Sequence, residues 1–245
     1  MQAQISVSGE INPYVMTRTT NSSQINLPFR LLSLDMGYSF EQFDLKTNSA
    51  IEHRIKTNKS QYDLRELYFA FYPEWGEVKL GRQIHSWGAA DAINPTNNLN
   101  PYDYYYMFKV GAGTKVGVFS LSSTYYSDSF QIEIIVNPYF NKNRIPYDED
   151  DFPLAPDNEP VIRYSPNEEV EVGLKLQTSL TNSDISLYFF SGNDRSPSLY
   201  TGIISAESST DLAMDLGYRK TTMLGSDYVT FVGDFTVRAE GAIYN

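Results

Sequence analysis

Long stretches of this chain alternate between apolar and polar side chains, and this period of two constrains the fold more than any other feature. The clearest stretch spans residues 29–45, where five apolar residues share one face, namely Leu32, Leu34, Met36, Tyr38 and Phe40. A β-strand points successive side chains to opposite faces, so alternation at this period is typical of strands. The stretch predicts a strand with one apolar and one polar face.

The same pattern recurs along the whole chain. Predicted strands lie near residues 5, 36, 53, 67, 80, 120, 133, 174, 187, 216 and 236, which makes eleven. Neighbouring strands joined by tight turns pair antiparallel. The 245 residues contain no linker rich in Pro, Gly or Ser. We therefore expect a single all-β domain over 1–245, with an antiparallel up-and-down sheet of about 10–12 strands.

The connections between the predicted strands fall into two classes. Those near residues 47, 74, 128, 182 and 226 are two to four residues long, and most of the others are longer. The longest are a loop over 84–111 and an acidic, Pro-rich loop over 137–167, whereas the connection at 58–61 is short where a long one is due. Short turns that alternate with long loops are typical of a transmembrane barrel of the outer membrane.

Strand length separates a membrane barrel from a soluble sandwich. The stretches 29–45 and 228–244 exceed the roughly 5 to 6 residues of soluble strands and reach the roughly 9 to 11 that cross a bilayer. In a barrel their apolar face meets lipid, and in a sandwich it meets a second sheet. A mean hydropathy of −0.37 is compatible with a barrel because lipid-facing and lumen-facing residues average out. These observations favour the barrel.

Composition excludes several classes of function. The chain has no Cys, which argues against disulfide scaffolds and thiolate chemistry, and a net charge of −11 argues against a nucleic-acid partner. His53 and His85 lack partners at ligand spacing, so we expect no metal and no cofactor. No nucleophile elbow, Walker loop or glycine fingerprint is present, so we expect no enzyme. The acidic run at 148–151 predicts a solvated loop, with a Ca²⁺ site as the alternative.

One segment, 64–103, carries a recognisable series of short motifs. In order these are Arg65-Glu66-x-Tyr68, Gly81-Arg82-Gln83, Trp87-Gly88-x-x-Asp91, Asn94-Pro95 and Asp103. The series resembles the DUF1302 family of Gram-negative outer-membrane β-barrels over about 40 of the 245 residues. The resemblance implies a porin-like barrel in the bacterial outer membrane that passes or binds a small solute.

The same segment supplies the candidate site. Two adjacent strands and the following loop place polar and aromatic residues where they could line a lumen, namely Arg65, Glu66, Tyr68, Lys79, Arg82, Gln83, Trp87, Asp91, Asn94 and Asp103. A loop folded into the lumen would constrict it and set selectivity. The alternative is a network that braces the barrel. Strict alternation would place Arg82 on the same face of the strand as the apolar Leu80. Whether its side chain points to the lumen therefore depends on a bulge or on the strand ending nearby.

Charges beside a low-dielectric wall must be paired, because an unpaired buried charge costs several kcal/mol. We therefore expect at least one charge pair across strands among Arg65, Glu66, Lys79 and Arg82.

Bacterial single-chain barrels close with an even number of strands. Eleven strands thus predict at least one further strand beyond Asn245.

The function expected from these patterns is passage or binding of a small solute by a monomeric or oligomeric outer-membrane barrel, with lipid as its surroundings. Two alternatives remain open. One is a soluble all-β binding module, for example for carbohydrate, in which the 19 Tyr residues would supply stacking surfaces. The other is a surface structural barrel whose outer loops bind a partner. Dependence on detergent and conductance in a bilayer discriminate these three functions.

Overall fold

The computed structural model describes residues 3–90, 94–147, 149–152, 162–164, 169–204 and 212–245. Eleven strands form one antiparallel sheet in chain order, which confirms the predicted all-β, up-and-down architecture. They are β1 (Gln4–Ile11), β2 (Phe29–Phe40), β3 (Phe43–Arg54), β4 (Lys59–Phe71), β5 (Gly76–Gln83), β6 (Val118–Tyr126), β7 (Phe130–Asn137), β9 (Glu171–Leu180), β10 (Ser183–Asn193), β13 (Lys220–Val232) and β14 (Phe235–Tyr244). A smaller sheet contains β8 (Ile162–Tyr164), β11 (Ser198–Ile204) and β12 (Leu212–Gly217).

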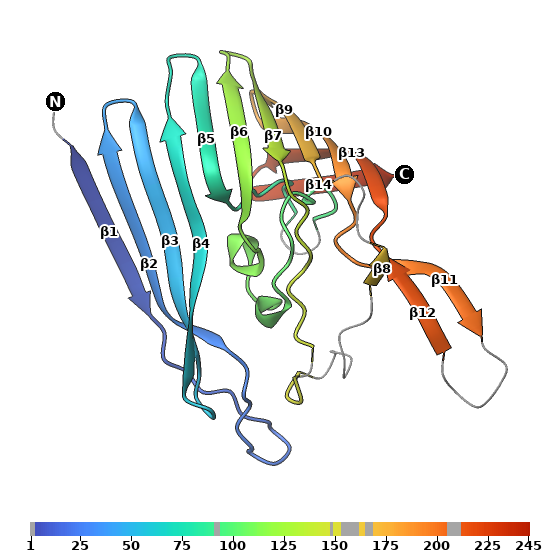
Figure 1. Ribbon diagram of the computed structural model, residues 1–245. Coiled ribbons are helices and arrows are strands. Elements are labelled where there is room, and N and C mark those ends of the chain that lie inside the picture. The colour runs from blue at the N-terminus through green and yellow to red at the C-terminus, as the bar shows by residue number, and fades with distance from the viewer. Residues whose placement is uncertain (1–2, 91–93, 148, 153–161, 165–168, 205–211) are drawn as a thin grey trace.

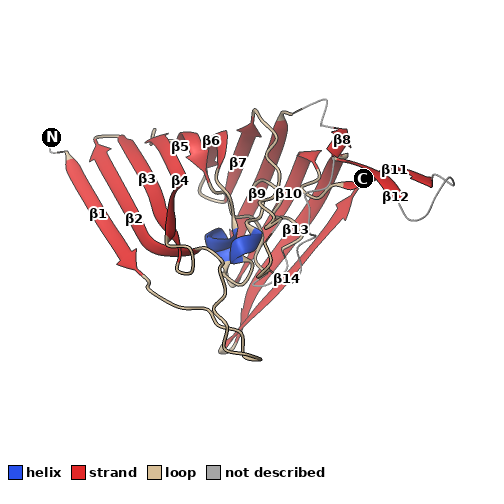
Figure 2. Cartoon of the chain, turned by 60° about the horizontal axis from the view of Figure 1, so that its bottom comes forward, coloured by secondary structure: helices blue, strands red, loops and turns tan. Residues whose placement is uncertain are grey.

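The large sheet is strongly curved and open. In the described part of the chain, β1 pairs only with β2 and β14 only with β13, so the two ends of the sheet stay apart. Figures 1 and 2 show the resulting trough, with β1 and β14 at its two margins. The strand containing Ile5 therefore does not pair with the strand containing Arg238, and the sheet does not close into a barrel.

The two rims of the trough differ as the sequence predicts. One rim carries only tight turns, at 41–42, 72–75, 127–129, 181–182 and 233–234. The opposite rim carries the long connections 12–28, 84–117, 138–170 and 194–219, of which 12–28 lies at the lower end in Figure 1. The short 55–58 connection is the exception on that rim, where β3 and β4 extend beyond the neighbouring β5.

Two predicted turns and one predicted strand are wrong in position. Residues 47–49 lie inside β3, and the turn falls at Glu41, which adopts a φ of 54°. Residues 225–227 lie inside β13, and that hairpin turns at Gly233, with a φ of 60°. The segment around Leu216 belongs to β12 of the smaller sheet, while β13 takes the predicted place in the large sheet. In the first two cases polar residues of the concave face mimic turn residues.

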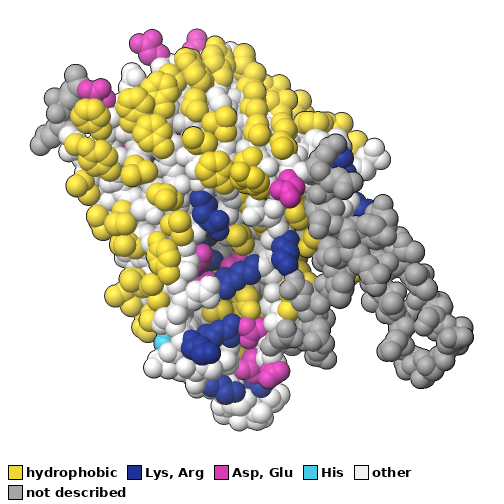
Figure 3. All heavy atoms as spheres, viewed as in Figure 1, with side chains coloured by type: hydrophobic (Ala, Val, Ile, Leu, Met, Phe, Trp, Pro, Cys, Tyr) yellow, Lys and Arg dark blue, Asp and Glu magenta, His cyan; other side chains and the backbone are white. Residues whose placement is uncertain are grey.

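The apolar face of the sheet is its exposed face. On β6 the outward Leu121 is 45 % exposed, whereas the inward Ser120 and Ser122 are 0 % and 5 % exposed. The same alternation holds on β4, where Leu67 and Phe69 are exposed and Ala70 is buried. Figure 3 shows hydrophobic side chains spread over this face, with charged side chains gathered in a strip toward the long-loop rim. No helix in the described residues is long and apolar enough to cross a membrane.

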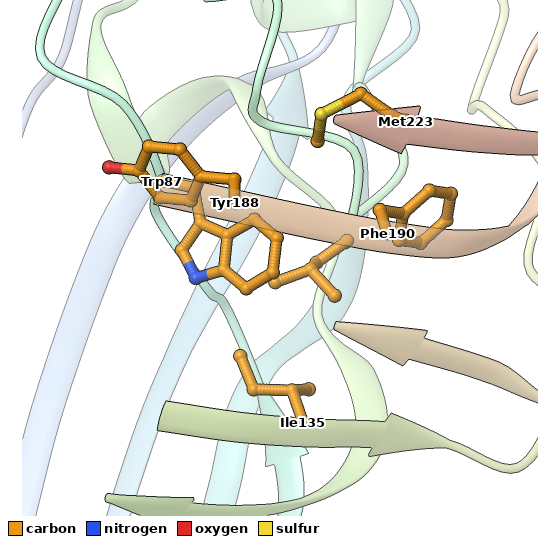
Figure 4. Packing of buried hydrophobic residues seen from close by; sticks show 6 residues of the cluster. Trp87, Ile135, Tyr188, Phe190 and Met223 are labelled. Carbon is orange, nitrogen blue, oxygen red and sulfur yellow. The ribbon is translucent and has the colours of Figure 1, made fainter. Parts of the chain in front are cut away.

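The hydrophobic core lies on the concave side, between the wall and the long loop 84–117. Trp87 and Leu99 from this loop pack against wall residues, namely Ile135, Tyr188, Phe190 and Met223 (Figure 4). Gly173 on β9 makes room for them, because a Cβ there would lie 2.6 Å from a ring carbon of Trp87 and 2.8 Å from a methyl of Leu99. Glycine within a strand marks such a close approach.

Candidate functional site

The loop 84–117 fills the concave side of the sheet and carries two short 3-10 helices, η1 (Tyr104–Tyr106) and η2 (Gly111–Thr114) (Figure 2). The loop expected over 84–111 extends to 117, because β6 begins at Val118. Its fully buried residues include Trp87, Thr96, Leu99, Asn100 and Pro101. The loop is therefore packed into the concave side of the sheet.

A bulge in β4 brings Arg65 and Glu66 to the same side. Asn48 pairs with Glu66 and Ser49 with Leu64, so Arg65 has no residue opposite. Such bulges redirect a side chain. Arg65 donates to the carbonyl of Ala112 at 2.5 Å, and Glu66 accepts from the backbone N–H of Ile84 at 2.9 Å. Both side chains thus hold the loop against the wall.

The expected charge pair across strands does not form among the four predicted residues, all of which the structure describes. Lys79 pairs with Glu77 on its own strand at 2.7 Å. Arg82 donates from Nε to the carbonyl of Leu64 at 2.8 Å, just beyond the point where pairing of β4 with β5 ends. Backbone carbonyls take the place of the expected carboxylate, so this prediction is wrong.

The other predicted wall residues lie on the concave side. Tyr68 and Glu66 line a cavity of about 180 Å³ together with Lys46 and Asp35. Gln83 is buried, donates to the carbonyl and hydroxyl oxygens of Ser120 at 2.9 Å, and accepts from Ser122 at 3.0 Å.

His85 continues the polar cluster formed by Gln83, because its Nε2 lies 2.8 Å from the hydroxyl of Ser120. Burial, together with the nearby positive charge of Lys79, lowers the pKa of His85 to about 3. The imidazole is therefore neutral at physiological pH, although sequence reasoning gave His85 no role.

The predicted loop residues do not form one cluster. Trp87 is buried in the core, where its Nε1 donates to Glu133 at 2.9 Å and its ring lies 5.2 Å from the ring of Tyr188. Asn94 is half-buried and lines the main cavity. Asp91 lies outside the described residues. Asp103 is buried at the far end of the loop, so the three described positions lie in different parts of the interior.

Asp103 belongs to a charged network at the base of the loop. Its carboxylate pairs with Arg144 at 3.1 Å and with Arg30 at 3.5 Å. Arg144 also binds Glu52 with two hydrogen bonds, at 2.9 and 2.7 Å, and the hydroxyl of Tyr106 donates to Glu52 at 2.8 Å. Burial, together with Glu52, raises the pKa of Tyr106 well above its usual range, so this hydroxyl remains a donor.

The main cavity on the concave side has a volume of about 510 Å³. Asn97, Tyr102, Tyr104, Met107 and Lys115 are among the residues that line it. The ammonium of Lys115 lies 3.4 Å from the centre of the Tyr102 ring and donates to the carbonyls of Asn97 and Asn100, at 3.1 and 3.4 Å. Burial lowers the pKa of Lys115 to about 7. Sequence reasoning missed Lys115 because nothing in its local pattern distinguishes it from a surface lysine.

Two further contacts bind the loop to distant strands. Glu240 on β14 accepts from the backbone N–H groups of Ala89 and Ala90, each at 3.0 Å. Arg195 pairs with Glu171 at 2.5 Å and donates to the carbonyl of Leu99 at 2.9 Å. The sequence places Glu240 on the polar face of the last strand, but no local signal identifies the loop as its partner.

The acidic run is not a freely solvated loop in its described part. Glu149 forms a bidentate ion pair with Arg54 and accepts from the hydroxyl of Tyr105 at 2.7 Å. Asp151 accepts from the backbone N–H of Asn26 at 2.7 Å and pairs with Arg18, also at 2.7 Å. The described residues contain no group of three or more His, Cys, Asp or Glu side chains that could hold a metal ion.

Comparison with known families now defines the relationship of this sheet to other proteins. A family model described as "Protein of unknown function (DUF1302)" matches residues 39–243. The chain belongs to the DUF1302 family. The resemblance of the 64–103 motifs to DUF1302 is thereby confirmed, and the match extends over the curved sheet from β3 onward and over the loop 84–117. The comparison with curated proteins gives no match.

Proposed function

We propose that this DUF1302 chain forms the wall of a bacterial outer-membrane β-barrel that binds or passes a small solute. The observation that carries the proposal is the polarity of the sheet. Its exposed face is apolar and its concave face is polar, as Leu121 beside the buried Ser120 and Ser122 illustrates. Such a face is suited to contact with lipid, since exposing apolar side chains to water is unfavourable in free energy.

The arrangement of the rims supports the same proposal. Tight turns at one rim and long connections at the other are the asymmetry of barrels inserted from the periplasmic side. The long loop 84–117 lies inside the trough and is held by Glu66, Arg195 and Glu240. A fixed loop of this kind narrows a lumen and selects what enters it. The proposed role is selective binding or passage of a solute without chemical conversion.

The soluble binding module has less support. Such a protein needs a second sheet over the apolar face, and the only other sheet in the described residues has three strands. The surface structural barrel shares the same wall and differs only in lacking permeation. The firmly anchored loop fits that role as well, so permeation must be measured directly.

The test is fractionation followed by electrophysiology. We expect the full chain in the outer-membrane fraction, extraction only with detergent, and discrete conductance steps in a planar bilayer. A monodisperse sample in water without detergent would contradict the membrane assignment. Membrane insertion without any conductance, with or without added solutes, would instead favour the surface structural barrel.

A further inference from the structure

Lys115 is a buried cation without a carboxylate partner. It is 2 % exposed, and none of the ion pairs among the described residues includes it. Other cations of the interior, Arg30, Arg144 and Arg195, each pair with an acid. Two backbone carbonyls and the Tyr102 ring contact the Lys115 ammonium, but they supply no net negative charge. Buried charges are normally paired, so a counter-ion is missing here.

Asn97, beside Lys115, has an unused polar group. Its side chain is 8 % exposed, and its Oδ1 has no hydrogen-bond partner among the residues that the structure describes. Such orphaned groups in native interiors are rare and call for a ligand, ion or water. The oxygen and nitrogen of a side-chain amide can exchange places by a flip, so Asn97 can offer N–H donors to an anion.

Both residues line the same cavity of about 510 Å³. This volume falls within the roughly 300 to 1,000 Å³ of small-molecule sites. The remaining lining includes the ring of Tyr104 and the apolar side chains of Met107 and Val110. Asp103 also borders the cavity, but Arg30 and Arg144 already neutralise its charge. The cavity thus combines a cationic end with an apolar body.

We propose that Lys115 and Asn97 bind the carboxylate of a small organic acid whose apolar body lies against Tyr104 and Met107. The proposal names the solute class for the function proposed above and rests on it. A carboxylate would supply the missing counter-ion and accept from the amide of Asn97 in a charge-assisted hydrogen bond. A neutral molecule of the same shape would gain only the apolar contacts.

The test compares benzoate with benzyl alcohol by calorimetry on the full chain in detergent at pH 6.5. We expect benzoate to bind at least tenfold more tightly. Lys115→Met should abolish this preference, and Lys115→Arg should keep part of it. Lys59→Met removes a positive charge from an exposed position on β4 and should leave the preference unchanged.

A second variant tests the same site independently, in case Lys115→Met does not fold. Asn97→Asp places an internal carboxylate beside the ammonium and should abolish benzoate binding while benzyl alcohol still binds. Equal affinities for the two probes in the wild-type chain would overturn the proposal, as would an unchanged preference in both variants. Inorganic phosphate that binds as tightly as benzoate would overturn the role of the apolar body. If conductance persists while benzoate shows no preference, only the solute class is wrong.

Discussion

The carboxylate of Glu240 accepts hydrogen bonds from both the backbone N–H and the hydroxyl of Thr96, at 3.0 and 2.8 Å, across 144 residues of sequence. Its other oxygen accepts from the N–H groups of Ala89 and Ala90. One side chain of the sheet therefore satisfies four donors of the loop 84–117. Because hydrogen bonds to charged groups contribute about 1.5 to 3 kcal/mol each, Glu240 is a principal anchor of the loop.

Glu240→Ala should release the first part of the loop from the wall. Four part-buried donors lose their acceptor, so the closed position of the loop should lose about 3 kcal/mol or more. We expect faster cleavage between 84 and 100 by an added protease, and a larger single-channel conductance. Asp234→Ala removes an acid from the β13–β14 turn and is the matched control. Identical cleavage rates in the two variants would exclude the anchoring role.

Acidification should destabilise the folded protein, because folding lowers the pKa of His85. Burial lowers its pKa to about 3 from an ordinary value of 6.5. Between these values the unfolded chain binds a proton that the folded chain excludes, so stability falls as the pH falls below 6.5. The groups facing the ring are Lys79 and the hydroxyl of Ser120, and neither supplies a negative charge.

The expected loss from His85 is about 3 kcal/mol between pH 7 and pH 4, and it should vanish in His85→Gln. Thermal unfolding in detergent, followed by circular dichroism across this range, measures the difference between the two proteins. Because other groups titrate equally in both, parallel pH profiles would show that His85 is not the source.

The sheet could be predicted from the sequence because the alternation of apolar and polar residues that defines its strands is a local pattern. Alternation decides which residues form strands, and it places Met36, Tyr38 and Phe40 together on the face that the structure exposes. Turn positions fail where the concave face is polar, since Asn48 in β3 and Asp227 in β13 look like turn residues but lie on the concave side, where Asn48 contacts Asp35 and Asp227 contacts Tyr188. Turn signals in such a sheet identify hairpins only when the apolar pattern also breaks.

The site could be predicted only in part, because long-range contacts define it. Motif spacing placed Trp87, Asn94 and Asp103 in the loop after the hairpin and left open whether that loop enters the lumen; in the structure Trp87 and Asp103 are buried and Asn94 is half-buried. Two partners of this loop, Arg195 and Glu240, lie about 95 to 150 residues further along the chain, and no local pattern links them to it. A usable signal was Gly173 in the middle of a strand, which indicates close approach of another segment.

Removing Arg195 should destabilise the fold strongly. Arg195 and Glu171 are both buried, and their nitrogen and oxygen lie 2.5 Å apart. Breaking a buried ion pair costs about 3 to 5 kcal/mol, because the remaining charge has no partner. Arg195→Met should therefore lower the unfolding temperature sharply. The double variant Arg195→Met with Glu171→Met should recover part of the loss, and failure to recover would show that the hydrogen bonds of Arg195 to the loop carbonyls dominate.

A single charge on the outer face discriminates lipid from water as its surroundings. Leu121 lies in the middle of β6 and is 45 % exposed. In a bilayer, Leu121→Arg should cost about 2 to 4 kcal/mol near the midplane. In water, a surface substitution of this kind usually changes stability by no more than about 0.5 kcal/mol. We therefore expect Leu121→Arg to reduce the yield of folded protein in the outer membrane.

The matched control for Leu121→Arg is Ser127→Arg, which adds the same charge to the tight turn after β6, where the side chain reaches the aqueous rim. This variant should insert as the wild-type chain does, because its charge never enters hydrocarbon. Yield is measured as the fraction of folded protein in outer-membrane preparations, and refolding into lipid vesicles gives the free-energy difference. Equal stability of both variants in vesicles would mean that the apolar face of the sheet does not contact lipid.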